Sequence, residues 1–514
     1  MQRAISARAA ARALLLFVLA VFVFPPTAQA QTILAGTVTD SSGAVLPGVT
    51  VEASSPALIE KVRTATTDTN GQYRLVDLRP GLYRVTFTLP GFTTVIRESV
   101  EVSGNQTISI GAEMRVGGVQ ESITVTGETP IVDVQSTRRV ATIDNSVVST
   151  IPVARGYGNL LATVPGIQIA GAGGTTSATG IAPSFFTANG GRSNEGRIQI
   201  AGMNVGSAFN GGGVAAFAYP VAESQEVQVT VSGGLGEADT GGPAMNIIPR
   251  EGGNRYAGTV FLSEAGEWSQ GDNLNDELRG PPSNITQPAG LIRNWDESFS
   301  LGGPILRDRV WFYGTLRDNG TVSNVLGNDR TSFPNLNAGL ANVWTYAPDR
   351  STDLRAATSV RQAAFRITGQ VTPRNKIGFY HDYNWACWDS SLVQDEGCRP
   401  RGEDWIALGR QNSAPETDTG WDDREKIIQA TYSSTATNRL LLEGGYSTFI
   451  STWGGHPVAG AIMDQIRVTE RNSSVYGQAN YNYRGLYTYS HNDQAPNVRR
   501  GSVSHGTGAQ NLKI

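Results

Sequence analysis

The side chains that could perform acid–base or metal chemistry are few in this sequence and are not spaced for it. The four histidines are His381, His456, His491 and His505, and no acid lies three residues after any of them. A zinc peptidase needs histidine and carboxylate ligands at such spacing around an open metal position. The patterns H-E-x-x-H and G-x-S-x-G are also absent. We therefore predict that the chain is not an enzyme and holds no catalytic metal or cofactor.

Three aspartates near the N-terminus raise the separate question of a calcium site. Asp40, Asp68 and Asp77 each lie in or beside a predicted turn. Carboxylates in β-turns usually accept hydrogen bonds from the turn itself. We expect that structural role, with calcium as the alternative.

Composition favours a β-rich chain with no affinity for nucleic acid. Glycine supplies 60 of 514 residues, charged residues make up 17 %, and the net charge is −4 with no basic run. The mean hydropathy is −0.21. A membrane β-barrel is compatible with that value, because half of each strand faces a polar lumen.

Residues 1–30 have the pattern of a secretory signal peptide. Arg3, Arg8 and Arg12 precede an apolar run over residues 13–24, and Ala28 and Ala30 form an A-x-A site. Twelve apolar residues are too few to cross a bilayer as a helix. We predict cleavage between Ala30 and Gln31.

Residues 31–115 are predicted to form a β-sandwich. Short β-prone runs recur about every ten residues, separated by turn signals such as Asn70-Gly71 and Pro80-Gly81. The phrases GTVTDSSGAVLPGV and TDTNGQYRLVDLRPGLYRV resemble the carboxypeptidase-regulatory-like module.

A glycine-rich stretch farther along joins two kinds of architecture. Residues 233–262, GGLGEADTGGPAMNIIPREGGNRYAGTVFL, contain three glycine doublets, and a fourth doublet is Gly190-Gly191. Such doublets mark tight turns or close approaches between backbones. The stretch resembles the plug-to-barrel join of TonB-dependent outer-membrane transporters. Together with the first module it is similar to the Oar-like branch, although Ala201-Gly202 stands where members often have Asp-Gly.

The resemblance implies a coupling segment within the linker 116–129. Its candidate residues form a short β-prone run, namely Ser122, Ile123, Thr124, Val125 and Thr126. We expect this run to be unpaired and to bind a TonB-type periplasmic protein as an added strand. A last strand of the sandwich, or a plain linker, is the alternative.

Residues 130–254 are expected to form an α+β plug domain. A short helix is predicted to precede Val164-Pro165-Gly166, and strands are predicted over 196–203 and 223–231. A glycine-rich loop then carries exposed-looking side chains that are candidate ligand contacts at the plug apex: Phe209, Asn210, Phe217 and Tyr219. Packing of Phe217 and Tyr219 against the barrel wall is the alternative.

Residues 255–514 are predicted to be the N-terminal part of an outer-membrane β-barrel. In residues 365–371, Phe, Ile, Gly and Val fall on one face and Arg, Thr and Gln on the other, and Thr372–Asn375 makes a tight turn. A second hairpin is predicted over 428–442. Polar stretches over 264–294, 318–360, 386–421 and 454–474 are predicted to be long external loops.

The only two cysteines, Cys387 and Cys398, lie in one of these predicted external loops. Because the resemblance takes the chain through an oxidising periplasm, we predict a disulfide between them. Two free thiols or a weak metal pair are the alternatives.

The number of strands expected in residues 255–514 also indicates whether the sequence contains a whole barrel. We expect about ten strands in it, whereas a plugged barrel has about 22, and residues 491–514 look polar and turn-rich. We therefore expect a fragment that ends before the barrel closes.

The sequence patterns and the resemblance together predict a mainly β fold: an N-terminal β-sandwich, an α+β plug and a partial antiparallel transmembrane β-barrel. The resemblance implies an outer-membrane receptor that takes up a small-molecule, glycan or peptide ligand with energy from a TonB-type protein. A surface binding or adhesion protein on the same barrel is the alternative.

Overall fold

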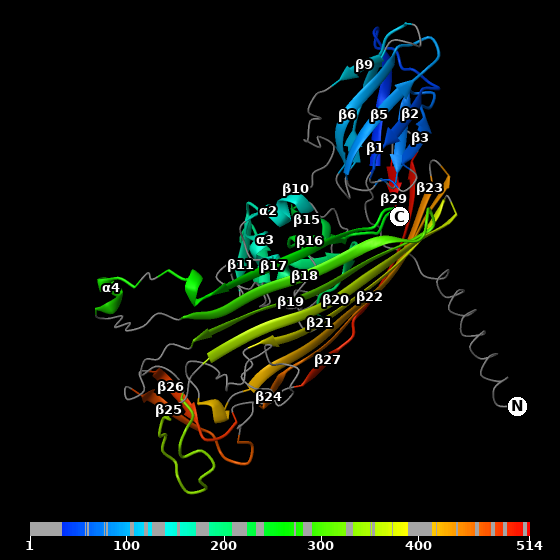
Figure 1. The fold of residues 1–514 in the computed structure, drawn as a ribbon. Helices are drawn as coiled ribbons and strands as arrows, with labels where there is room; N and C mark the ends of the chain where they lie inside the picture. Colours follow the sequence, from blue (N-terminus) through cyan, green and yellow to red (C-terminus); the bar gives the residue numbers. More distant parts are fainter. Residues whose placement is uncertain are drawn as a thin grey trace, which may run out of the picture.

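The structure is a computed structural model whose described residues fall between 33 and 513. Outside them lie 1–32, 126–138, 171–184, 208–220, 233–240, 281–289, 325–332, 389–413 and 514, and gaps of one to four residues elsewhere. The chain is mainly β, and its sheets follow one another as a sandwich, a plug and a large sheet of long strands (Figure 1). No described helix has the length and apolar character needed to cross a membrane.

The sandwich is made of strands with one buried face and one exposed face. In β5 (Gly81–Thr88), Tyr83, Val85 and Phe87 are buried and alternate with more exposed neighbours. This alternation lets two sheets pack face to face around one apolar core. One sheet has the order β4-β1-β7 with β8 on β1, and the other has the order β3-β2-β5-β6-β9. The remaining strands are β1 (Ile33–Asp40), β2 (Thr50–Ser54), β3 (Val62–Thr66), β4 (Gln72–Val76), β6 (Thr94–Val102), β7 (Thr107–Ser109), β8 (Ala112–Met114) and β9 (Ser122–Val125).

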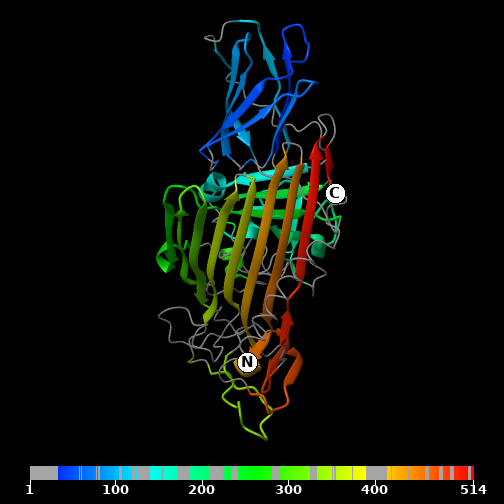
Figure 2. The same ribbon diagram turned by 90° about the vertical axis from the view of Figure 1, so that its right-hand side faces the viewer.

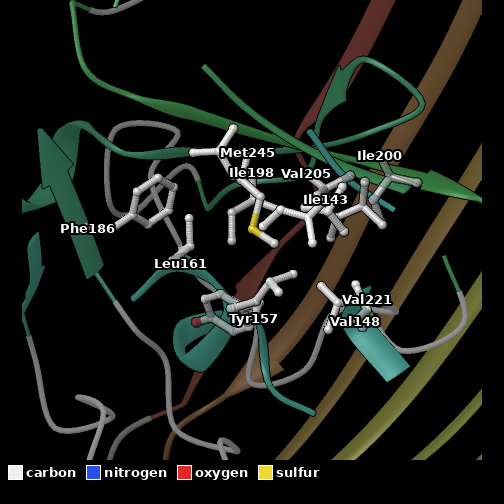
Figure 3. Close-up of a cluster of buried hydrophobic side chains, with 14 of the residues drawn as sticks. Ile143, Val148, Tyr157, Leu161, Phe186, Ile198, Ile200, Val205, Val221 and Met245 are labelled. Carbon is white, nitrogen blue, oxygen red and sulfur yellow. The ribbon is translucent and has the colours of Figure 1, made fainter. Parts of the chain in front are cut away.

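The plug is a five-stranded mixed sheet with short helices beside it. The sheet order is β10-β15-β16-β13-β14, in which β13 and β16 are parallel, and β11 pairs with β12. Apolar side chains from the sheet and from both helices form its core, including Tyr157, Leu161 and Phe186 (Figure 3). The elements are β10 (Arg139–Asp144), α2 (Asn145–Thr150), α3 (Tyr157–Leu161), β11 (Ile167–Ala170), β12 (Phe185–Ala188), η1 (Ser193–Glu195), β13 (Arg197–Ile200), β14 (Met203–Asn204), β15 (Ser224–Ser232) and β16 (Ala244–Pro249).

Two glycine doublets behave as the sequence predicted. Gly190 has a φ of +77°, a left-handed conformation that side chains disfavour. At the join after β16, a Cβ on Gly252 would overlap the backbone of Phe312 in the large sheet, whereas Gly253 has open space around it. The join therefore needs glycine because one backbone lies directly on another.

Eleven described strands form the large sheet, and every pairing among them is antiparallel. Its order is β17-β18-β19-β20-β21-β22-β23-β28-β29, with β24 on β22 and β27 on β23. The long strands lie side by side with the plug behind them (Figure 2). The strands are β17 (Ala257–Gly266), β18 (Leu291–Leu306), β19 (Val310–Asn324), β20 (Arg355–Thr372), β21 (Asn375–Trp388), β22 (Thr419–Thr437), β23 (Leu440–Trp453), β24 (Gly455–Pro457), β27 (Asn492–Gln494), β28 (Asn497–Gly506) and β29 (Asn511–Lys513). η2 (Glu267–Ser269) and α4 (Asp276–Arg279) follow β17.

The two faces of this sheet differ as the alternation predicted. Phe365 and Ile367 point outward and are 43 % and 38 % exposed, while their inward neighbours Gln362 and Thr368 are buried. Around these residues the outward face is thus apolar and the inward face polar, the arrangement of a membrane barrel wall.

Strand length was underestimated from the sequence. β19 continues to Asn324 and β20 begins at Arg355, inside the predicted loop 318–360. The polar residues of these strand ends do not exclude them from the sheet; Asn319, for example, is buried. The tail was also misjudged, because β28 lies within 491–514 and pairs with β23.

Connections at the end of the sheet remote from the sandwich form a separate cluster (Figure 1). It combines residues 333–349, η4 (Pro415–Thr417) and the hairpin of β25 (Val468–Ser473) and β26 (Gln478–Tyr483). Tyr346, Tyr481 and Tyr483 form its core. Arg484 ties the three parts together: its backbone N–H donates to Glu416 at 3.0 Å, and its guanidinium donates to the Ala341 carbonyl at 2.6 Å and lies 3.8 Å from the Trp344 ring centre. Burial raises the pKa of Glu416.

Candidate functional site: the coupling strand and the plug–wall contacts

The candidate coupling run is paired, so the expectation of an unpaired segment is wrong. Ser122–Val125 forms β9, which lies parallel to β6 with Ile96 opposite Thr124. Pairing satisfies backbone groups that would otherwise be solvated, and β9 lies at the end of the sheet order. Thr126 is outside the described residues. The alternative expected from the sequence, that the run is a last strand of the sandwich, describes this arrangement. The coupling role stays a prediction.

A cluster of charged side chains beside α3 holds the plug to the large sheet, which we call the wall. Arg155 donates from Nη1 to Ser298 Oγ at 3.1 Å and lies 3.8 Å from Asp296 Oδ2. Arg317 on β19 donates to the same carboxylate at 2.8 Å and also to the Arg155 carbonyl at 3.2 Å. Because Asp296 is shared by two guanidinium groups, the plug loop and two wall strands form one network. The Arg155 guanidinium also lies 4.1 Å from the ring centre of Phe261 on β17.

A second charged group lies where the plug chain enters the wall. Glu251 accepts hydrogen bonds from Arg366 Nη2 at 2.6 Å and from Lys376 Nζ at 3.1 Å. Arg366 also donates to the carbonyl of Pro249, the last residue of β16. The three charged side chains are only 14–20 % exposed, so their attraction is weakly screened. A cavity of about 150 Å³ adjoins them, lined also by Met203, Glu443 and Arg500.

Two further hydrogen bonds between described plug and wall residues join neutral groups. Gln429 on β22 donates to the Ile200 carbonyl at 3.1 Å, and Ser207 donates to Gln494 Oε1 at 2.6 Å. Three wall side chains, Tyr380, Ile427 and Phe449, belong to the apolar core of the plug. Polar contacts thus lie around an apolar patch that the plug and the wall share.

Several predicted site residues lie outside the described residues. These are Ala30, Gln31, Phe209, Asn210, Phe217, Tyr219 and Cys398. Cys387 is within β21, so it belongs to a strand end rather than to the loop. The cleavage site, the apex contacts and the disulfide stay predictions.

The turn aspartates act as expected where they are described. Asp40 Oδ1 accepts from the backbone N–H groups of Ser42 and Ala44 at 2.8 and 3.0 Å, and Asp68 accepts from those of Asn70 and Gln72. Asp77 is outside the described residues. The described part of the chain shows no cluster of three or more histidine, cysteine or acidic residues placed to bind a metal.

Sequence reasoning missed Arg155 and Glu251. Alternation placed Arg366 on the polar face of its strand, but its plug partner lies 115 residues away in sequence. No spacing pattern marks such a pair. A charged residue directly at the Gly252-Gly253 join is the one signal that could have drawn attention to Glu251.

Comparison with known proteins agrees with this architecture. Residues 33–115 match the carboxypeptidase regulatory-like domain family. Over 294 residues, 56 % of this chain, the sequence is 30 % identical to the TonB-dependent transporter Oar of Myxococcus xanthus. The resemblance to Oar-like TonB-dependent transporters is confirmed. The chain spans 26 % of the length of that relative.

Two solved structures are similar to part of this chain. The ferric yersiniabactin uptake receptor FyuA from Yersinia pestis has a TM-score of 0.45 and 11 % identity, with 73 % of this chain and 46 % of FyuA covered. The outer membrane transporter YddB from Escherichia coli has a TM-score of 0.45 and 11 % identity, with 71 % and 45 % covered.

Proposed function

We propose that this chain belongs to a TonB-dependent outer-membrane receptor that takes up a small-molecule, glycan or peptide ligand with energy from a TonB-type protein. The supporting observation is a plug packed on the inner face of a membrane-type sheet and attached there by polar contacts at Arg155, Glu251 and Ile200. Such a plug blocks passive flow and can yield to a pull. The outward apolar face supports location in the outer membrane.

We further propose that Ser122–Thr126 is the segment on which the TonB-type protein pulls. Support comes from its position: β9 stands last in its sheet order, and only residues 126–138 separate it from β10 of the plug. A partner strand can pair with such an edge by backbone hydrogen bonds. A pull on β9 would be transmitted through that short connection to the plug sheet.

The test compares Thr124→Pro with Thr124→Val in the full-length protein in cells. Proline removes a backbone donor and fixes φ, whereas valine preserves the β-strand backbone. The readout is depletion of compounds from spent growth medium by mass spectrometry, against a strain lacking the gene. We expect Thr124→Pro to abolish depletion while binding at the surface persists in de-energised cells, and Thr124→Val to behave as wild type.

Each other result has a definite meaning. Normal depletion by Thr124→Pro would place the coupling segment elsewhere. If no compound is depleted by the wild type relative to the deletion strain, although the protein binds medium components, the adhesion alternative is favoured.

A further inference from the structure

We propose that the outward face of β20, β21 and β22 binds the phosphate group of an anionic lipid in the outer leaflet. The site is a cation–aromatic patch that consists of Arg361, Tyr383, Trp385, Arg424 and Lys426. This inference rests on the proposed location in the outer membrane, but it concerns a ligand and a surface that the uptake function does not need.

Strand register brings the patch together. Trp385 lies opposite Arg361 on one side and opposite Arg424 on the other. Both guanidinium groups approach its ring, with the carbon of Arg361 5.6 Å and that of Arg424 5.2 Å from the ring centre. Tyr383 lies opposite Lys426, whose ammonium is 5.8 Å from the tyrosine ring centre. Three cations and two aromatic rings thus occupy two adjacent rows across three strands.

The alternation of the strands turns this patch toward the lipid side. The neighbours Gln362, Asn384 and Glu425 are buried against the inside of the sheet. Arg424 and Lys426 are exposed. Farther along the same face of β20 and β21, Phe365 and Phe379 are 43 % and 38 % exposed. The cations and the apolar band therefore belong to one continuous outer surface.

The height of the patch matches a headgroup rather than an acyl chain. Tyr383 is four residues past Phe379, or about 13 Å along the strand. β20 and β21 are joined by a tight turn at their other end, whereas the patch lies near the long connections that we assign to the outside. An amphiphile can place its acyl chains on the phenylalanines and its headgroup at the cations, where tyrosine and tryptophan favour the interface.

The small extent of the positive patch favours an anion of limited size. Along the row through Trp385, the first carboxylate is Asp318, which lies 3.4 Å from Arg361. Glu297 follows it on β18, and on the other side Thr452 separates Arg424 from Asp493. The positive surface is therefore confined to three strands, about 10 Å wide at the usual strand spacing. That width suits one phosphorylated headgroup, and guanidinium groups bind phosphate in a bidentate manner.

The test measures lipid retention by the purified full-length protein with native mass spectrometry. The probes are bis-phosphorylated lipid A and the same lipid without phosphates. We expect wild type to retain the phosphorylated lipid through detergent exchange. The variant Arg361→Gln/Arg424→Gln/Lys426→Gln should lose retention on the order of tenfold or more, because each cation near an anionic lipid surface contributes separately. Excess inorganic phosphate should not displace the lipid.

Two controls keep the outcome decisive. Arg307→Gln/Arg309→Gln/Arg374→Gln removes the same charge at the opposite end of the strands, where tight turns connect them, and should retain lipid as wild type does. Arg361→Lys/Arg424→Lys keeps the charge and should keep most of the retention, which guards against a folding defect in the glutamine variant.

The proposal is overturned if the glutamine variant retains lipid normally, if both lipids are retained equally, or if inorganic phosphate displaces the lipid. The measurement needs no energy source and no transported ligand. A protein without uptake that still shows phosphate-dependent retention would therefore refute the proposed function and leave this inference standing.

Discussion

At the scale of single residues, the contacts that matter most join segments far apart in sequence. The pattern of residues 365–371 correctly separated an apolar face from a polar face, and Phe365 and Arg366 point as predicted. It could not name the partner of Arg366, because alternation reports a face and not a neighbour. The partner is fixed only when the join places Glu251 beside β20.

Removing the charge of Glu251 is expected to loosen the end of the plug sheet. In Glu251→Gln, Arg366 and Lys376 stay partly buried without their shared carboxylate, at a cost of about 1–3 kcal/mol. Hydrogen exchange of the β16 amides should speed up accordingly. The matched control is Glu264→Gln, since Glu264 is 62 % exposed in its ion pair with Arg293 and such pairs contribute about 0–1 kcal/mol. Equal effects of the two substitutions would contradict the anchoring role.

At the scale of elements, local signals predicted the sandwich, both wall hairpins and the plug strand β15. Each of these strands alternates between polar and apolar residues or is bounded by turn residues. They did not predict that β9 pairs with β6. A run of four residues with no adjacent turn signal does not specify which strand it will pair with. The parallel pairing of β9 with β6 depends on the folded sandwich, which brings β6 to the edge of its sheet.

The plug helix α2 offers a test at this scale. Asp144 caps it by accepting from the Val147 N–H at 2.9 Å, and hydrogen bonds from Ser146 hold the pKa of Asp144 below its ordinary value. In Asp144→Ala, α2 should lose about 1 kcal/mol, seen as faster hydrogen exchange at Ile151. In wild type the cap contributes above the unfolded-state pKa, and its contribution is lost as pH falls through the lowered one. Asn275→Ala, which removes the cap of α4, should leave Ile151 unchanged, and a slow Ile151 in Asp144→Ala would refute the cap.

The glycine doublet at the join gives a second test. Gly252→Ala would press a methyl group into the backbone of Phe312, while Gly253→Ala meets open space. We expect Gly252→Ala to destabilise the protein by about 1–3 kcal/mol and Gly253→Ala to change stability by less than about 1 kcal/mol. Thermal unfolding of the two variants in parallel measures this. Similar melting temperatures would show that the join tolerates a side chain at Gly252.

At the scale of the whole molecule, turn spacing together with the resemblance to TonB-dependent transporters predicted the order of sandwich, plug and wall, but not how firmly the plug is attached. Attachment depends on Arg155, Glu251, Ile200 and Ser207, which reach different strands of the wall. Under the proposed function, uptake requires these contacts to yield together when the chain ahead of the plug is pulled.

A reversible bond between plug and wall tests that requirement most directly. A Cβ on Gly445 of β23 would lie 2.9 Å from the Met203 sulfur of β14, so Met203→Cys/Gly445→Cys in a Cys387→Ser/Cys398→Ser background should cross-link on oxidation. The measurement is depletion of compounds from spent medium by cells, with the cross-linked fraction determined in the same sample and each single cysteine as control. We expect depletion to stop in proportion to cross-linking and to return on reduction. Normal depletion by fully cross-linked protein would contradict the requirement that the plug yields.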